Sequence, residues 1–191
     1  LNVTLVAPYV FDASVKQIFG VLLQGYRLHI VPEEARVEGG LLKEFYNRHS
    51  IDISDGTPIH IRLLIDSLRD APGSMRVRQF IVGGEALPRP VVENFFRLLP
   101  RLDVGITNIY GPTECCVDNT AFPVTRDNVS KWETIPIGMP LANQAVYILD
   151  KNHRLQPVQV AGELCIGGDN VGHGYLNRPE LTAEKFIRHE L

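Results

Sequence analysis

Cysteine is scarce in this sequence, and its distribution excludes two kinds of small stabilised domain. The chain has three cysteines, two of them adjacent at Cys115 and Cys116, and six histidines scattered along its length. This distribution gives neither a disulfide framework nor the ligand spacing of a zinc site. We therefore expect a protein of the reducing cytoplasm, in which Cys115 and Cys116 are small buried side chains.

Long apolar runs and clusters of positive charge are missing as well. No segment approaches the roughly 18 apolar residues that a membrane span needs. The net charge of -3 arises from interspersed acidic and basic residues, which leaves no basic stripe for a phosphate backbone. No G-x-G-x-x-G fingerprint opens a helix after a strand, which argues against a dinucleotide-dependent dehydrogenase. We expect no membrane and no nucleic acid among the partners.

Apolar residues, in contrast, are plentiful. They make up 45% of the 191 residues, which is sufficient for a hydrophobic core. The chain starts at Leu1 and enters an apolar stretch over residues 3–6 without the pattern of a signal peptide. We expect it to be a piece excised from a larger domain.

Helical and strand patterns alternate through the first two thirds of the chain. Apolar residues three or four apart predict helices around residues 15–22, 41–45, 59–68 and 91–99. Short apolar runs predict strands over residues 27–31, 51–54, 77–82 and 104–109. Gly25 is placed to end the first helix. Repeated units of this length predict an α/β fold, with a mostly parallel sheet covered by helices on both faces.

The last third has a different texture. After about residue 122 the sequence is polar and dotted with prolines, with short strand patterns at residues 145–149 and 163–166 and a helical pattern at 179–187. We expect an α/β subdomain over residues 1–122, which carries the site loops, followed by a smaller β-rich subdomain over residues 123–191.

Four polar loops that contain small or turn-forming residues follow the predicted strands. They are FDAS (residues 11–14), SDGTP (54–58), GGEALP (83–88) and YGPTE (110–114). Ligands of parallel sheets bind outside the carboxyl ends of the strands, so these loops predict a binding site. Taken alone, YGPTE is also compatible with an ordinary Gly-Pro turn.

Five motifs in order carry a resemblance to a known family. FDAS, GGEALP, NIYGPTE, IPIGMPLAN and GELCIGGDNVGHGYLNRPELTAEKF resemble, in order and approximate spacing, the adenylation domains of non-ribosomal peptide synthetases, which belong to the adenylate-forming superfamily. The resemblance covers essentially the whole chain. It implies a ligase of antibiotic biosynthesis that forms an aminoacyl-adenylate from an amino acid and Mg-ATP. It also implies transfer to phosphopantetheine on a carrier-protein domain, beside condensation domains of the same synthetase.

The resemblance implies a nucleotide site around NIYGPTE. Tyr110 would stack on adenine, Thr113 would contact the α-phosphate, and Glu114 would hold Mg²⁺, a hard cation that prefers carboxylate oxygen. Glycines in these loops would let the backbone approach the ligand closely. The implied catalytic pair is Thr113 and Glu114, and the implied ATP-binding set is Gly83, Gly84, Glu85, Asn108, Ile109, Tyr110 and Gly111.

The family's substrate positions carry over as a second set. Asp12 would bind the substrate ammonium, which separates this chain from fatty-acid and aryl-acid ligases. The set resembles the pattern associated with glutamate, and Lys16 would pair with the γ-carboxylate, since a buried charge needs a partner. Its members are Asp12, Ala13, Lys16, Asp55, Ile81, Gly83, Ile109, Val117 and Asp118.

Three alternatives stay open. If Asp55 or Asp118 neutralises Lys16, glutamine or another neutral polar amino acid becomes preferable. Without the resemblance, Asp12 and Lys16 would be interpreted as a surface ion pair at i, i+4.

The phosphate loop, the ribose-binding aspartate and the carboxy-terminal subdomain of the family are not found in the sequence. We therefore expect no activity from this chain alone, and a non-catalytic nucleotide-binding or interaction module is the other class of function.

Two segments depart from the family pattern, and in one of them Cys115 and Cys116 replace the threonines that are common after GPTE. Gly172 and His173 stand where the family usually has Ala-Arg, so no phosphate role is expected there.

Overall fold

The computed structural model describes residues 1–70, 75–100 and 103–188 and divides the chain into two compact units. The sheet unit comprises Leu1–Tyr110 and Thr120–Met139, and the small unit comprises Gly111–Asn119 and Pro140–Leu191. Residues 120–122 and 123–139 thus lie in the same compact unit. The expected subdomain boundary between residues 122 and 123 stays a prediction.

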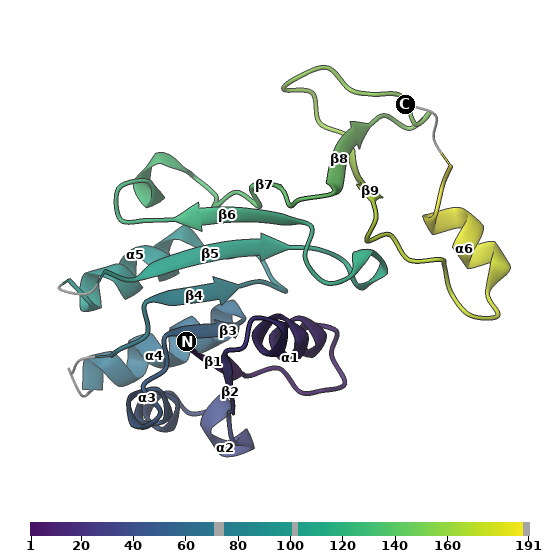
Figure 1. Ribbon diagram of the computed structural model, residues 1–191. Coiled ribbons are helices and arrows are strands. Elements are labelled where there is room, and N and C mark those ends of the chain that lie inside the picture. Colours follow the sequence, from purple (N-terminus) through teal and green to yellow (C-terminus); the bar gives the residue numbers. More distant parts are fainter. Residues whose placement is uncertain (71–74, 101–102, 189–191) are drawn as a thin grey trace. The chain divides into compact units, whose positions relative to one another are not determined.

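A mostly parallel sheet forms the centre of the sheet unit (Figure 1). Its strand order is β2-β1-β3-β4-β5-β6-β7, with β1 to β5 paired in parallel and β6 antiparallel to β5. This confirms the predicted fold class. The strands are β1 (Asn2–Leu5), β2 (Arg27–Ile30), β3 (Ile53–Gly56), β4 (Gln79–Val82), β5 (Gly105–Tyr110), β6 (Thr120–Val124) and β7 (Met139–Pro140).

Helices cover the two faces of this sheet unequally. On one face α3, α4 and α5 lie side by side, and α1 lies on the other (Figure 1). The alternation of side chains along β3 shows this, because Ser54 bonds to Tyr46 of α3 whereas Asp55 bonds to Gln17 of α1. The helices of the unit are α1 (Ala13–Leu23), α2 (Glu33–Arg36), α3 (Gly39–Arg48), α4 (Pro58–Asp70), α5 (Arg89–Leu98) and the 3₁₀ turn η2 (Val129–Lys131).

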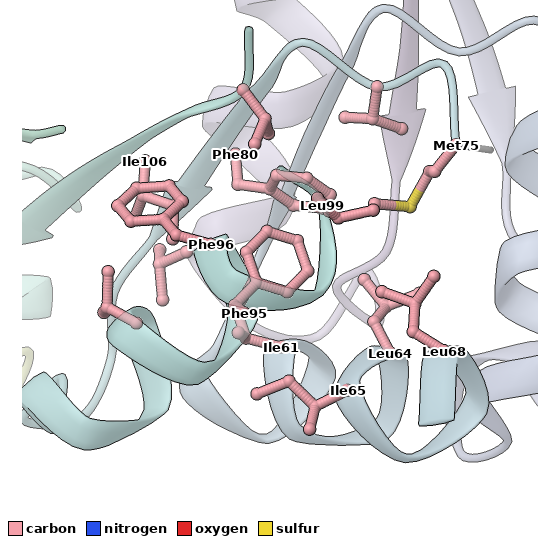
Figure 2. Packing of buried hydrophobic residues seen from close by; sticks show 14 of the residues in the cluster. Ile61, Leu64, Ile65, Leu68, Met75, Phe80, Phe95, Phe96, Leu99 and Ile106 are labelled. Carbon is pink, nitrogen blue, oxygen red and sulfur yellow. The ribbon is translucent and has the colours of Figure 1, made fainter. Parts of the chain in front are cut away.

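The hydrophobic core lies between the sheet and the α3 to α5 layer (Figure 2). Phe80 of β4 and Phe95 of α5 meet edge to face with ring centroids 5.2 Å apart, a favoured aromatic geometry. The apolar residues of α4 recur every three or four positions and are buried against the same cluster. The helical periodicity of residues 59–68 therefore marked a core-facing stripe. Core residues labelled in Figure 2 are Ile61, Leu64, Ile65, Leu68, Met75, Phe80, Phe95, Phe96, Leu99 and Ile106.

Gly25 ends α1 as the sequence predicts. Its φ of +68° is in the left-handed region that glycine adopts without steric cost. The N–H of Gly25 donates to Leu22 O, and the N–H of Tyr26 donates to Val21 O. These two bonds form a Schellman motif, which satisfies the last carbonyls of the helix and turns the chain into β2.

The small unit contains a two-stranded antiparallel sheet and one short helix. Strand β8 (Gln144–Leu149) pairs with β9 (Glu163–Gly168), and α6 (Pro179–Lys185) follows. The 3₁₀ turn η1 (Thr113–Cys115) belongs to the same unit. The predicted smaller β-rich part of the fold is thus confirmed, and its sheet is antiparallel. Cys116 corrects one expectation, because it is exposed whereas Cys115 is buried.

Candidate functional site

The predicted substrate residues of the sheet unit come together from four separate segments. Asp55 lies in β3, and its register partner on β4 is Ile81. Gly83 follows β4 directly and continues the ladder by donating its N–H to Gly56 O at 3.1 Å. Lys16 projects from α1, which covers this face of the sheet. Adjacent parallel strands therefore bring residues that are distant in the sequence into one neighbourhood.

An ion pair lies at the centre of this group. The Lys16 Nζ is 2.8 Å from Oδ2 of Asp55, and their side chains are 23% and 7% exposed. The other carboxylate oxygen of Asp55 accepts a 2.8 Å hydrogen bond from Nε2 of Gln17. A carboxylate removed from water needs such partners, and Asp55 has both a cation and an amide donor.

Gly83, which follows β4, packs closely against Ile109 of β5. A Cβ atom on Gly83 would lie only 2.6 Å from Cγ1 of Ile109 and 2.9 Å from its carbonyl oxygen. Both residues are buried, and Ile81 next to them is half-buried. The glycine is thus required for the approach of β4 to β5 at this point.

Asp12 and Ala13 lie at the beginning of α1. Asp12 is half-buried at the N-cap position, and its backbone carbonyl accepts from Val15 N–H. Lys16 is one helical turn further along. Spacing at i, i+4 is typical of two residues on one side of a helix.

The residues predicted to border the base occupy both sides of β5 and the turn after β4. Asn108 is buried and donates from Nδ2 to Pro136 O at 2.8 Å, on the face opposite to Ile109. Tyr110, at the end of β5, is 39% exposed. Gly84 and Glu85 are exposed in the turn before α5, and Gly84 has a φ of +82°. The roles of these residues toward a nucleotide stay predictions.

In the small unit, a single turn holds the predicted catalytic pair. Thr113 is exposed and Glu114 is half-buried in η1. The carboxylate of Glu114 accepts a hydrogen bond from the Tyr175 hydroxyl, and its carbonyl oxygen accepts from Gly172 N–H at 2.8 Å. The segment with Gly172 and His173, which departs from the family pattern, thus contacts Glu114 through its backbone.

Tyr175 is a residue that sequence reasoning missed. Its hydrogen bond to Glu114 raises the pKa of Tyr175, so the phenol stays protonated and serves as the donor. The two residues are separated by 61 positions. The only signal in the sequence was the position of Tyr175 inside the GHGYL motif, which does not identify a partner.

Val117 and Asp118 follow in a strained turn of the small unit. Cys116 and Val117 have φ values of 57° and 74°, which are rare for side chains with a Cβ and most of all for a β-branched one. A Cβ on Gly111 would lie 2.3 Å from Val117 O. The absence of that atom in glycine lets the turn fold back on itself.

No group of three or more histidine, cysteine or acidic side chains in the described parts of the chain could hold a metal ion by itself. Mg²⁺ is commonly held by one or two carboxylates together with substrate phosphates, so a single carboxylate such as Glu114 fits that mode. Among the described residues, no helix is long and apolar enough to cross a membrane.

Comparison with known proteins identifies the family. Residues 2–176 match the protein family described as "AMP-binding enzyme". The chain is 50% identical over 189 residues to bacitracin synthase 1 of Bacillus licheniformis, covering 99% of this chain and 4% of the relative. It is 45% identical over 190 residues to surfactin synthase subunit 1 of Bacillus subtilis, covering 98% and 5%. The chain thus spans only about a twentieth of these curated relatives, as those shares show.

Solved structures give the same result. A crystal structure of a nonribosomal peptide synthetase matches with a TM-score of 0.87 and 28% identity, covering 97% of this chain and 20% of that one. A four-domain synthetase bound to AMP and glycine matches with a TM-score of 0.85 and 34% identity, covering 98% and 13%. The chain belongs to the AMP-binding enzyme family and, within it, to the adenylation domains of non-ribosomal peptide synthetases.

Proposed function

We propose that this chain carries the amino-acid and ATP recognition loops of an adenylating ligase that loads a carrier protein. The observation that carries the proposal is the convergence of Lys16, Asp55 and Gly83 from separate segments on one face of the sheet. When bound, Mg-ATP supplies the α-phosphorus that the amino-acid carboxylate attacks, with pyrophosphate as the leaving group. The proposed partners are the carrier and condensation domains of the same cytoplasmic synthetase.

We propose roles for three residues in η1 and immediately before it. Glu114 would hold Mg²⁺ through its carboxylate, which the Tyr175 hydroxyl orients. Thr113, exposed one residue earlier, would donate its hydroxyl to a phosphate oxygen. Tyr110, which precedes this turn in the chain, would offer its exposed ring to adenine.

For the amino acid itself, L-glutamate is the proposed substrate. An ammonium has three N–H donors, so one lysine can serve two carboxylates. Asp55 accepts from Gln17 as well as from Lys16, which spreads its charge over two partners. Ile81 and Ile109 supply apolar surface for the methylene groups of an unbranched side chain. Asp12 would bind the substrate ammonium.

A second candidate substrate, glutamine, is favoured by the ion pair itself. With Lys16 paired to Asp55 at 2.8 Å, the two side chains together present a donor and an acceptor without net charge. A primary amide also has both a donor and an acceptor, and it matches such a pair without burying another charge. The two substrates therefore differ in the charge that this pair must accommodate.

Amino-acid-dependent pyrophosphate exchange by the complete adenylation domain that contains this chain tests the substrate. We expect glutamate to have the larger kcat/KM. We also expect Lys16→Met to reduce the preference for glutamate over glutamine by about tenfold or more, the factor that corresponds to ~1.4 kcal/mol. Lys151→Met, at an exposed position, is the matched control. Faster activation of glutamine by the unaltered domain would contradict the glutamate proposal.

The same assay separates an enzyme from a non-catalytic module. The complete domain should exchange pyrophosphate, whereas this chain by itself should not, because the family's remaining catalytic segments are not in its sequence. Nucleotide binding without exchange by the complete domain would favour the module.

A further inference from the structure

Gln17 is a buried residue of α1 to which the adenylation reaction assigns no role. It is 3% exposed. Its Oε1 accepts from the N–H of Val6 at 2.9 Å and from the N–H of Ala7 at 3.0 Å. Its Nε2 donates to Oδ1 of Asp55 at 2.8 Å. Gln17 thus joins the segment that follows β1 to the carboxylate in β3.

The orientation of this carboxamide is fixed by its partners. Two backbone N–H groups require an acceptor, so they must face the oxygen, and the NH₂ group must then face Asp55. Asp55 must in turn accept with Oδ1, which leaves Oδ2 directed at Nζ of Lys16. The position of the lysine charge therefore depends on a chain of contacts that starts at Gln17.

We propose that Gln17 is a positioning residue for amino-acid selection, because it holds Asp55 and, through Asp55, sets where the Lys16 ammonium meets the substrate side chain. This inference rests on the proposed function, since it takes Lys16 to face that side chain.

The chemical identity of residue 17 matters because a carboxamide donates to Asp55 without adding charge. A glutamate has nearly the same shape and could still accept from Val6 and Ala7, but it would place a second carboxylate against Asp55. Like charges at this distance repel, and Lys16 would be drawn between two acids. Less of the lysine charge would then be directed at a substrate carboxylate.

The experiment compares Gln17→Glu with the unaltered sequence in the complete adenylation domain, by pyrophosphate exchange with glutamate and with glutamine. We expect the ratio of kcat/KM for glutamate over glutamine to fall about tenfold, as for the loss of one hydrogen bond to a charged group. The KM for ATP should stay unchanged. Gln24→Glu is the matched control, because this substitution adds the same charge at an exposed position at the end of the same helix.

An exchange of partners provides the second test. In the double variant Gln17→Glu with Asp55→Asn, the donor and acceptor swap places, and the net charge equals that of the unaltered pair. We expect this double variant to recover part of the glutamate preference lost in Gln17→Glu. The effects of two substitutions within one hydrogen-bond network are not additive. Equal loss toward both amino acids in Gln17→Glu, without recovery in the double variant, would overturn the proposal. It would mean that Gln17 maintains the fold only.

The two proposals fail in distinguishable ways. The substrate proposal depends on the preference of the unaltered domain, whereas the role of Gln17 depends on how that preference changes. A domain that prefers glutamine would refute glutamate as the substrate, but a shifted ratio in Gln17→Glu would still support the positioning role. An unshifted ratio would refute that role whichever amino acid is preferred.

Discussion

The substitution Gly83→Ala probes the close approach of β4 to β5 at the proposed substrate site. Gly83 is buried, and a Cβ at this position would lie 2.6 Å from Cγ1 and 3.1 Å from Cδ1 of Ile109. It would also lie 2.9 Å from the carbonyl oxygen of Ile109. A rotation of the isoleucine side chain can relieve the first two contacts but not the third.

The expected cost follows from these distances. Optimal carbon–carbon contacts are about 3.5–4.0 Å, so the closest contact is short by roughly 1 Å. Overpacking of this kind usually costs about 1–3 kcal/mol, and the strands must separate to relieve it. Because the backbone of Ile109 cannot move independently of β5, we expect Gly83→Ala both to destabilise the domain and to raise the KM for the amino acid.

The assay is thermal unfolding of the complete adenylation domain together with pyrophosphate exchange. Gly20→Ala is the control, because Gly20 lies inside α1 and an added methyl group would meet nothing within 4 Å. An alanine there should stabilise the helix by about 0.5–1 kcal/mol. Opposite shifts in melting temperature are therefore expected for the same chemical change. A Gly83→Ala domain as stable and as active as the unaltered one would refute the packing argument.

Three further predictions concern other contacts. Tyr175→Phe removes the hydrogen-bond donor to the Glu114 carboxylate. It should therefore raise the Mg²⁺ concentration needed for half-maximal pyrophosphate exchange and leave the amino-acid KM unchanged. It should also weaken Mn²⁺ binding in the presence of nucleotide, measured by electron paramagnetic resonance. Tyr46→Phe should cost about 1 kcal/mol in urea unfolding, because it removes a buried 2.7 Å hydrogen bond to Ser54. Glu38 accepts two backbone N–H groups at the start of α3, which lowers its pKa. Its contribution should be present above its unfolded pKa and be lost as the pH falls through the folded one, so the unaltered chain and Glu38→Gln should converge in stability in acid.

The elements of the fold could be predicted where the amphipathic pattern was strong. Residues 59–68 carried a clear apolar stripe and form most of α4, and Gly25 ends α1 through a Schellman motif. Strand β6 was not predicted, because Pro123 cannot donate to a ladder and argues against a strand in the middle of a sheet. Its pairing with β5 depends on tertiary contacts that periodicity does not describe.

The residues of the candidate site were predictable as a set but not as a network. The resemblance implied that Lys16 and Asp55 both belong to the substrate site, but it did not say whether they pair with each other. The structure shows that they do, at 2.8 Å. Gln17 gave no signal, since a glutamine on a helix is ordinarily an exposed polar residue. Tyr175 has its partner 61 residues away, and only folding brings the two together.

The charge of residue 17 bears directly on how this site can distinguish glutamate from glutamine. Asp55 and Lys16 cancel each other in formal charge, so a count of charges alone gives no preference for a negative side chain. A preference then requires that Lys16 contact the substrate carboxylate as well as Asp55, which is favoured when another donor also satisfies Asp55. Gln17 is that donor in the structure, and it adds no charge of its own. Selection of a charged substrate would therefore depend on the placement of a neutral amide. The hydrogen bond from this amide determines how strongly Asp55 attracts the Lys16 ammonium.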